Sequence, residues 1–195
     1  KLWNAARFAL MKFPADWVPS LTPDEILATS DAGTSPPAIH HVWILHRLEE
    51  LKDEVARAIE GYRFNDAGQA LYQFIWHEFC DWYLELIKPE LSSSDPAAVE
   101  SALCCLYATL ADVLVLLHPI MPFVTQEIWS HLPGKENDDL ALARYPESLA
   151  NRRKPEVVHT MSLIQEIVVG VRDIRSELNI SPNVPLELHV RTAAA

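Results

Sequence analysis

The sequence has few basic residues for a chain that would bind nucleic acids without selectivity. It contains 16 Lys and Arg against 27 Asp and Glu, which gives a formal net charge of −11. Such a charge excludes a surface that is basic throughout, because phosphate groups would be repelled over most of it. Any contact with RNA must therefore be local, made by a small basic area on an otherwise acidic body.

Glycine is scarce as well, with 5 residues in 195, while hydrophobic residues make up 49%. This composition suits one helical domain with a proper core. No glycine-rich phosphate-binding loop and no ordered Ser-His-Asp set occurs in the sequence. The motifs therefore predict no catalytic site and no cofactor in this chain.

The sequence also lacks any spacing typical of metal ligands. Three cysteines cannot all pair with one another, and we interpret them as reduced thiols of a cytoplasmic protein; they are Cys80, Cys104 and Cys105. A metal site needs three or four converging ligands. The histidines that stand near other possible ligands share no clustered pattern, so we expect no metal site; they are His40, His41, His46 and His77.

Long hydrophobic runs and targeting segments are absent too. The most apolar run, Val113 to Val124, has about a dozen residues and is broken by prolines, whereas a membrane-spanning helix needs about 20. No signal peptide is visible at the start. We therefore expect a cytoplasmic protein with no membrane contact. Because Lys1 opens inside a helical pattern without a methionine, we also expect a fragment of a longer protein.

Prolines, capping residues and apolar periodicity divide the chain into helices. Residues 22–25, TPDE, have the form of a capping box, and Asp95 with Pro96 has the form of a cap followed by a first-turn proline. We expect LELHV, 186–190, to begin a strand, so that a helical domain covers residues 1–182 and a truncated segment covers 183–195. The expected helices cover residues 1–13, 22–29, 38–59, 62–91, 96–117, 122–132 and 156–178, with loops at 14–21, 30–38 and 133–139 and an irregular segment at 140–155.

The stretch from Tyr62 to Leu91, which we call the spine, constrains the rest of the chain most. We interpret it as one α-helix, capped by Asn65 and ended by Pro89. At 100° per residue its apolar face is wide enough to touch at least two other helices, with Trp76 at the centre. We therefore predict an all-α helical bundle around the spine, with Glu78 paired to an arginine of a neighbouring helix. The predicted face consists of Leu71, Tyr72, Ile75, Trp76, Phe79, Cys80, Trp82, Tyr83, Leu86 and Ile87.

One stretch of the spine, FNDAGQALYQFIWHEFCDWYLELIKPEL, resembles the anticodon-binding helical domain of class I aminoacyl-tRNA synthetases, most closely the valyl-tRNA synthetases. Four other stretches agree in the same order: KLWNAARFALM at 1–11, VWILHRL at 42–48, LLHPIMPFVTQEIW at 116–129 and IQEIVVGVRDIRSELNISP at 164–182. The resemblance implies a helical bundle of that type, with the anticodon stem-loop of a tRNA as partner. It also implies a monomeric parent enzyme that attaches valine to tRNA with ATP and Mg²⁺ on its own catalytic domain.

The basic N-terminal helix is the best candidate for an RNA-binding site. Within little more than one turn, Asn4, Arg7 and Phe8 offer base-edge bonding, a guanidinium plane and an aromatic plane, which are the means by which proteins read single-stranded RNA bases. The alternative is a solvated helix face with Trp3 and Phe8 as aromatic residues of the core. The resemblance implies that Arg7 and Phe8 contact anticodon bases. The predicted RNA-binding residues are Asn4, Arg7, Phe8, Lys12, Arg172 and Arg175.

Three alternatives stay open from the sequence. Arg172 and Arg175 lie on one face of the last helix, where they either hold phosphates or pair with nearby acidic residues. An isoleucyl- or leucyl-tRNA synthetase is the nearest rival family, because the LLHPIMPF-like stretch is common to these enzymes. A helical protein-interaction module is the rival from another class, and it would suit the charge of −11 better.

Overall fold

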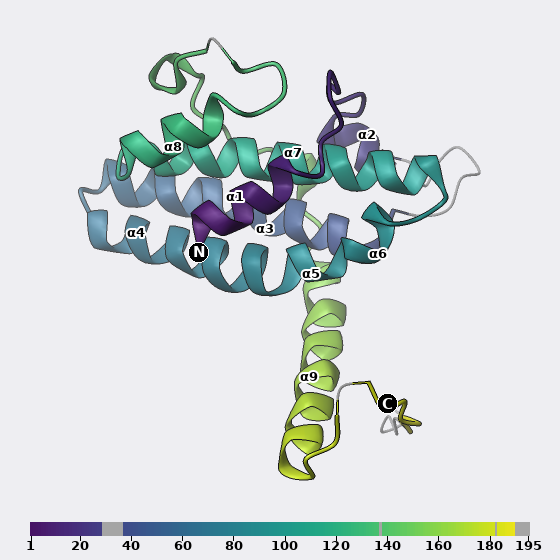
Figure 1. Cartoon of the computed structure of the whole chain (residues 1–195). Coiled ribbons are helices and arrows are strands. Elements are labelled where there is room, and N and C mark those ends of the chain that lie inside the picture. The colour runs from purple at the N-terminus through teal and green to yellow at the C-terminus, as the bar shows by residue number, and fades with distance from the viewer. Residues whose placement is uncertain (29–36, 137, 182, 190–195) are drawn as a thin grey trace. The chain divides into compact units, whose positions relative to one another are not determined.

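The computed structural model describes residues 1–28, 37–136, 138–181 and 183–189. These residues form helices, turns and irregular segments, with no strand among them, so the predicted all-α class is confirmed (Figure 1). The chain divides into two compact units, Lys1–Val157 and Val158–Ala195. This division falls before the boundary predicted after residue 182. Most of the predicted loop at 30–38 lies outside the described residues.

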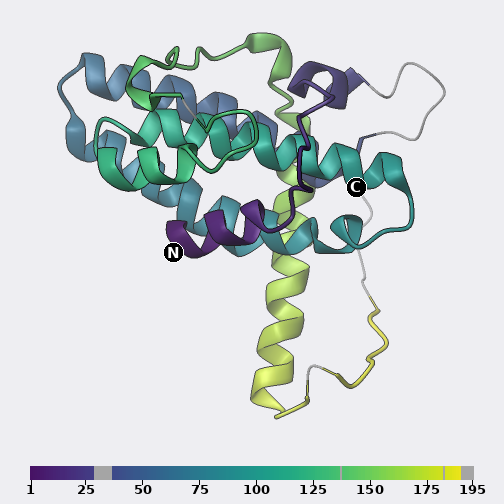
Figure 2. The same ribbon diagram turned by 45° about the horizontal axis from the view of Figure 1, so that its top comes forward.

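The first unit is a helical bundle in which α7 (Pro96–Leu117) is central. It packs against α2 (Pro23–Ala28), α3 (Ile39–Glu60) and α8 (Pro122–Trp129), while α1 (Leu2–Leu10) lies across the bundle in contact with α7 and α8 (Figures 1 and 2). Leu106, Leu110 and Leu114 of α7 are fully buried. Their spacing of four residues places them along one line of the helix, where they form the middle of the core.

Helix α7 is also long and apolar enough to cross a membrane by length and composition, which the sequence analysis did not anticipate. An 18-residue window of it has a mean hydropathy of 1.8, and 56% of that window is buried inside the bundle. A helix that is apolar all round is either a membrane span or the core of a helical protein. Its contacts with α2, α3, α8 and the short helix α6 (Lys88–Leu91) are those of a core helix.

Two predicted helix starts are confirmed at atomic detail. The backbone N–H of Thr22 donates to Glu25 Oε2 at 2.7 Å, and the N–H of Glu25 donates back to Thr22 Oγ1 at 3.3 Å. This is the reciprocal arrangement of a capping box. Asp95 Oδ1 accepts a hydrogen bond from the N–H of Ala97 at 3.0 Å, and Pro96 is the first residue of α7.

The spine is helical, but it is not one α-helix. It consists of α4 (Phe64–Gln73), a π-helix η1 (Phe74–Tyr83), α5 (Leu84–Leu86) and α6 (Lys88–Leu91). The predicted cap at Asn65 is wrong, because the helix starts at Phe64 with Arg63 before it and no side-chain cap. Pro89 does not end the spine either. The regular pattern breaks at Ile87, and Pro89 lies in the first turn of the short α6.

The π-helix explains why the predicted burial of Trp76 is wrong: this residue is 36% exposed, and Tyr72 is 48% exposed. In a π-helix the hydrogen bonds run from i to i+5, so each turn holds more residues than an α-turn. One series of buried positions runs along the spine four residues apart: Leu71, Ile75, Phe79, Tyr83 and Ile87. In an α-helix, residues four apart are offset by 40° around the axis at each step, so such a series does not stay on one face. The prediction assumed α-helical geometry throughout the spine, and it therefore placed Trp76 on the buried face.

The prediction for Glu78 is confirmed. Arg47 of α3 donates to it through Nε at 2.8 Å and Nη2 at 3.0 Å, a bidentate pair between two neighbouring helices. This hydrogen bonding raises the pKa of Arg47 above its ordinary value. The pair is structural, and it fixes η1 against α3.

The irregular segment 140–155 contains two short 3₁₀ turns, η2 (Leu140–Leu142) and η3 (Ala150–Arg152). Its basic side chains face acids of the bundle: Arg152 Nη2 lies 2.7 Å from Asp24 Oδ2, and Arg153 is paired with Asp53. These arginines therefore fasten the segment to α2 and α3, and they are not an open basic patch.

Helix α9 (Glu156–Glu177) starts at the end of the first unit and makes up most of the second. The segment that follows it, residues 183–189, is irregular, so the strand predicted from residue 186 is not formed in the part that the structure describes. The alternating pattern alone does not make a strand, because a strand needs a neighbour to pair with its backbone groups.

Candidate nucleic-acid interface

Helix α1 turns its small side chains inward and its functional side chains outward. Ala5, Ala6 and Ala9 are buried, and their size lets the helix lie close to α7, α8 and η1. Asn4 and Arg7 are exposed on the other side. No ion pair or hydrogen bond of the Arg7 guanidinium is found in the described part of the chain. The predicted pair of a base-edge group and a cation is thus presented to solvent.

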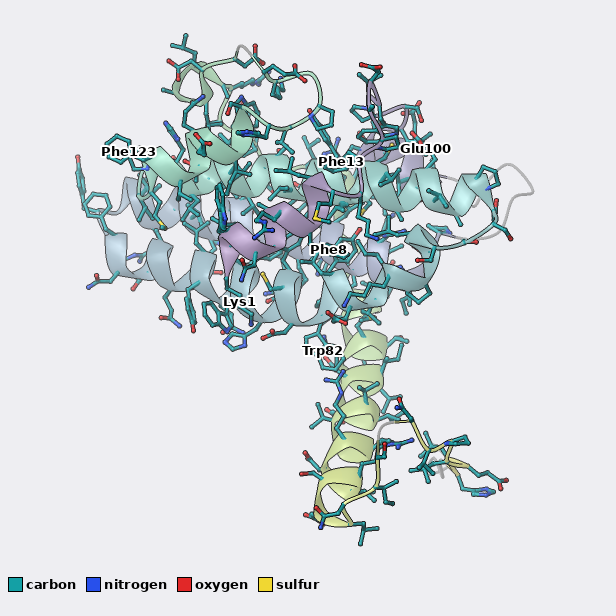
Figure 3. The ribbon with its side chains drawn as sticks, viewed as in Figure 1. Lys1, Phe8, Phe13, Trp82, Glu100 and Phe123 are labelled. Carbon is teal, nitrogen blue, oxygen red and sulfur yellow. The ribbon has the colours of Figure 1, made fainter. Side chains whose placement is uncertain are left out.

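Phe8 is half-buried and has two cations close to its ring. Lys12 Nζ lies 5.4 Å and Lys88 Nζ 5.9 Å from the ring centroid. Lys88 belongs to α6, so the spine contributes to this site although only α1 was predicted to form it. The sequence left two alternatives for Phe8, a ring that contacts RNA and a residue of the core, and the structure matches neither fully. Phe8 packs against the body and still offers part of its surface to a ligand (Figure 3).

A pocket of about 320 Å³ opens beside the start of α1. Its lining includes Lys1, Leu71, Tyr72, Trp76 and Met121. The rings of Tyr72 and Trp76 are stacked, with centroids 5.3 Å apart, and Lys1 Nζ lies 4.3 Å from the Trp76 centroid. An aromatic pair with a cation above it is suited to stacking an unpaired base.

Sequence reasoning missed this pocket because it assigned Trp76 to the core. The signal in the sequence was the i, i+4 spacing of Tyr72 and Trp76. If both had been placed on the outward face of the spine, they could have been grouped with Lys1. Lys1 is held there by an ion pair with Asp81 and a 3.4 Å hydrogen bond to the Trp76 carbonyl. We call this pocket together with the outer face of α1 and Lys88 the α1 surface.

The two predicted arginines of α9 lie in the second unit. Arg175 donates to the carbonyls of Ser181 at 2.7 Å and Val184 at 2.8 Å, so its guanidinium ties the segment after α9 back onto the helix. It forms no ion pair with an acidic side chain among the described residues, and phosphate binding stays a prediction. Arg172 and Arg175 line a pocket of about 820 Å³ in this unit. Their role in RNA binding stays a prediction.

None of the cysteines has the character of a reactive thiolate. Burial raises the pKa of Cys80 to about 11 and that of Cys105 to about 12, and burial also raises the pKa of Cys104. All three are free. Neutral buried thiols act as small apolar side chains, in agreement with the predicted reduced state.

Two of the histidines do have a converging partner, which the sequence did not reveal. One ligand atom each of His40, His41 and Glu90 lies within 4.8 Å of the others. The first two residues belong to the first turn of α3 and the third to α6. Their distance in the sequence hid this cluster, and it is the one place among the described residues where three groups of this kind converge.

Comparison with known proteins agrees with this geometry. Residues 41–190 match the family described as the anticodon-binding domain of tRNA ligases. The chain belongs to this family. The match includes the spine and extends through α7, α8 and α9, and it begins just after the start of α3. Helix α1 precedes the matched residues and packs against α7, α8 and η1, which lie within them.

Individual relatives of this anticodon-binding domain extend over α1 as well. The chain is 46% identical over 195 residues to the valine–tRNA ligase of Nitratidesulfovibrio vulgaris, covering 100% of this chain and 21% of the relative. It is 44% identical over 187 residues to that of Geobacter sulfurreducens, and 36% identical over 193 residues to that of Bacillus subtilis. These matches cover 94% and 99% of this chain, and 20% and 21% of the relatives. The chain thus spans about a fifth of the length of these relatives.

Proposed function

We propose that this anticodon-binding domain holds the anticodon stem-loop of a valine tRNA, as part of a valine–tRNA ligase. The observation that carries the proposal is the α1 surface. There Asn4 and Arg7 face solvent, and Phe8 offers part of its ring close to two lysines. Similarity to valine–tRNA ligases over almost the whole chain supports valine over the rival amino acids.

In this proposal the parent is a monomeric cytoplasmic enzyme that attaches valine to tRNA with ATP and Mg²⁺ on a catalytic domain outside these residues. The α1 surface contributes the recognition. Unpaired anticodon bases stack on Phe8 and on the Tyr72–Trp76 pair, while Asn4 bonds a base edge. Arg7 and Lys12 contact phosphates or stack on bases.

Base stacking and charge attraction separate experimentally. We expect Phe8→Ala to weaken tRNA binding by about 1–3 kcal/mol, the usual loss for one stacked base, with an unchanged salt slope. Arg7→Ala should weaken binding and make the slope of log K against log salt shallower by about 0.7–0.9 if Arg7 neutralises one phosphate. The measurement is tRNA affinity of the full-length ligase at several salt concentrations, with valine anticodons and altered ones.

Matched controls are available on the same domain. Phe123 is 90% exposed at the start of α8, apart from Phe8 (Figure 3), so Phe123→Ala controls for loss of an exposed aromatic ring. Arg144, which pairs with Glu147 outside the α1 surface, controls for loss of one cation. Unchanged affinity of both test variants, or a loss for Phe8→Ala that merely follows unfolding, would contradict the proposal.

A further inference from the structure

His40, His41 and Glu90 form a group whose geometry is that of metal ligands, with His41 buried and the other two partly exposed. Nε2 of His40 lies 3.1 Å from Glu90 Oε1, and Nε2 of His41 lies 2.8 Å from Glu90 Oε2. Ligands held about 2.0–2.2 Å from a tetrahedral zinc ion are about 3.3–3.6 Å from one another. The separations in this group, all within 4.8 Å, lie around that value.

The same atoms lack the hydrogen bonds that buried polar groups normally make. His40 Nε2, His41 Nε2 and Glu90 Oε2 are buried without a hydrogen-bond partner in the described structure, although the distances between them are short. The close approaches are therefore not aligned as N–H···O bonds. His41 is only 1% exposed, so water does not reach it freely. Buried polar groups of this kind call for a bound ion or water.

Nδ1 of His41 has a hydrogen-bond partner, as the second ring nitrogen of a metal-binding histidine usually does. Nδ1 lies 3.1 Å from the hydroxyl of Tyr83, which is itself fully buried in η1. When Nδ1 carries the proton and donates it to the hydroxyl oxygen, Nε2 is left with a lone pair that faces the Glu90 carboxylate. A lone pair and a carboxylate repel each other unless a cation lies between them.

We propose that His40, His41 and Glu90 bind one Zn²⁺ ion, or a divalent ion of similar chemistry, between the start of α3 and α6. Imidazole and carboxylate together are typical zinc ligands, and three protein ligands leave a fourth position for water. The ion joins a long helix to a four-residue turn that follows the break at Ile87. The same turn carries Lys88 beside Phe8, so the ion fixes an edge of the α1 surface.

The test is direct metal binding by the 195-residue chain. After removal of metals with a chelator, the chain is titrated with ZnCl₂ in a calorimeter and with Co²⁺ under visible absorption, which reports the number and type of ligands. We expect one ion per chain. His40→Asn and Glu90→Gln should each lower the affinity at least about tenfold, since even the loss of an outer partner costs 10–100-fold.

His77→Asn is the matched control, because His77 is an exposed spine histidine beside Asp81 and lies outside the group. It should bind Zn²⁺ as the unchanged chain does. Stability gives a second reading that does not depend on calorimetry: free Zn²⁺ at 100 times its Kd should raise the folding equilibrium constant about 100-fold for the unchanged chain and not for His40→Asn.

Two substitutions guard against a failure to fold. Glu90→Gln keeps the size of the side chain, His40→Asn keeps a smaller polar side chain, and circular dichroism shows whether each variant is helical. Absence of saturable Zn²⁺ binding, equal affinity of the unchanged chain and both folded variants, or a loss of binding caused by His77→Asn would overturn the proposal. A tenfold loss confined to the two site variants supports it.

Discussion

Replacement of Lys52 by methionine tests how the core tolerates charge. Lys52 and Glu49 lie one turn apart on α3, with side chains only 2% and 1% exposed. Nζ of Lys52 lies 2.8 Å from Glu49 Oε1 and 2.7 Å from Asp112 Oδ2 of α7. Methionine keeps the length of the apolar stem and removes only the ammonium group, so the change leaves two carboxylates without their cation and creates little cavity.

The expected loss of stability depends on the partners that Glu49 retains after Lys52 is replaced. Removing one partner of a buried ion pair usually costs about 3–5 kcal/mol, because the other charge stays buried and uncompensated. Glu49 Oε2 still accepts the N–H of Leu149 at 2.6 Å, and Arg152 Nη1 stays 3.7 Å from its other oxygen. These contacts retain part of the compensation, so we expect a loss at the lower end, about 3 kcal/mol.

Urea unfolding followed by far-UV circular dichroism measures this loss, with the m-values compared between variants. The double variant Glu49→Gln with Lys52→Met should be more stable than Lys52→Met alone, because neutral glutamine can still accept from Leu149. Arg144→Met, at an exposed pair, should leave stability unchanged within error. A loss below about 1 kcal/mol for Lys52→Met, or a double variant that is simply additive, would refute the reasoning about buried charge.

Two further predictions concern the spine and the connection before α2. Phe79 is fully buried and Trp76 is 36% exposed. Phe79→Ala should therefore lower the free energy of unfolding in urea by about 3–5 kcal/mol, and Trp76→Ala should lower it clearly less. The reverse order would mean that Trp76 is the buried residue, as a regular α-helix predicts. Burial alone would raise the pKa of Glu100, but hydrogen bonds from Ser20 and Trp17 outweigh it and lower the pKa from 4.5. This carboxylate therefore adds stability above about pH 4.5 that is lost as the pH falls below it, and Glu100→Gln should flatten the stability profile there; an unchanged profile would contradict this.

Local signals predicted the starts of α2 and α7 correctly because their causes are local, whereas the predicted cap at Asn65 and end at Pro89 were wrong. The capping box at residues 22–25 and the cap at Asp95 depend on neighbours two or three residues away. The partner of Glu78 was predictable in kind, as an arginine of another helix, because a carboxylate at the edge of an apolar face needs such a partner. Which arginine it is depended on the packing of α3 against η1, which no local pattern contains.

The spine shows the limit of periodicity. Its apolar residues are compatible with 100° per residue, and nothing in the composition states that the hydrogen bonds change from i+4 to i+5 at Phe74. That change places Phe74 in the core and Trp76 outside it. The buried pair of Glu49 and Lys52 was not predicted at all, because its partners, Asp112 and the segment at 140–155, lie far away in the sequence.

The charges also determine how an acidic chain of net charge −11 can bind RNA. On the α1 surface Lys1 is paired with Asp81 and Lys88 with Glu85, which leaves Arg7 and Lys12 as cations with no acidic partner in the described structure. Each phosphate contact contributes about 0.7–0.9 to the salt slope, so few such contacts give a shallow slope and a weak non-specific affinity. Most of the binding free energy must then come from stacked bases, and stacking requires an unpaired loop. In the proposed function, an acidic body would thus disfavour double-stranded RNA, while the α1 surface would accept the unpaired bases of an anticodon loop.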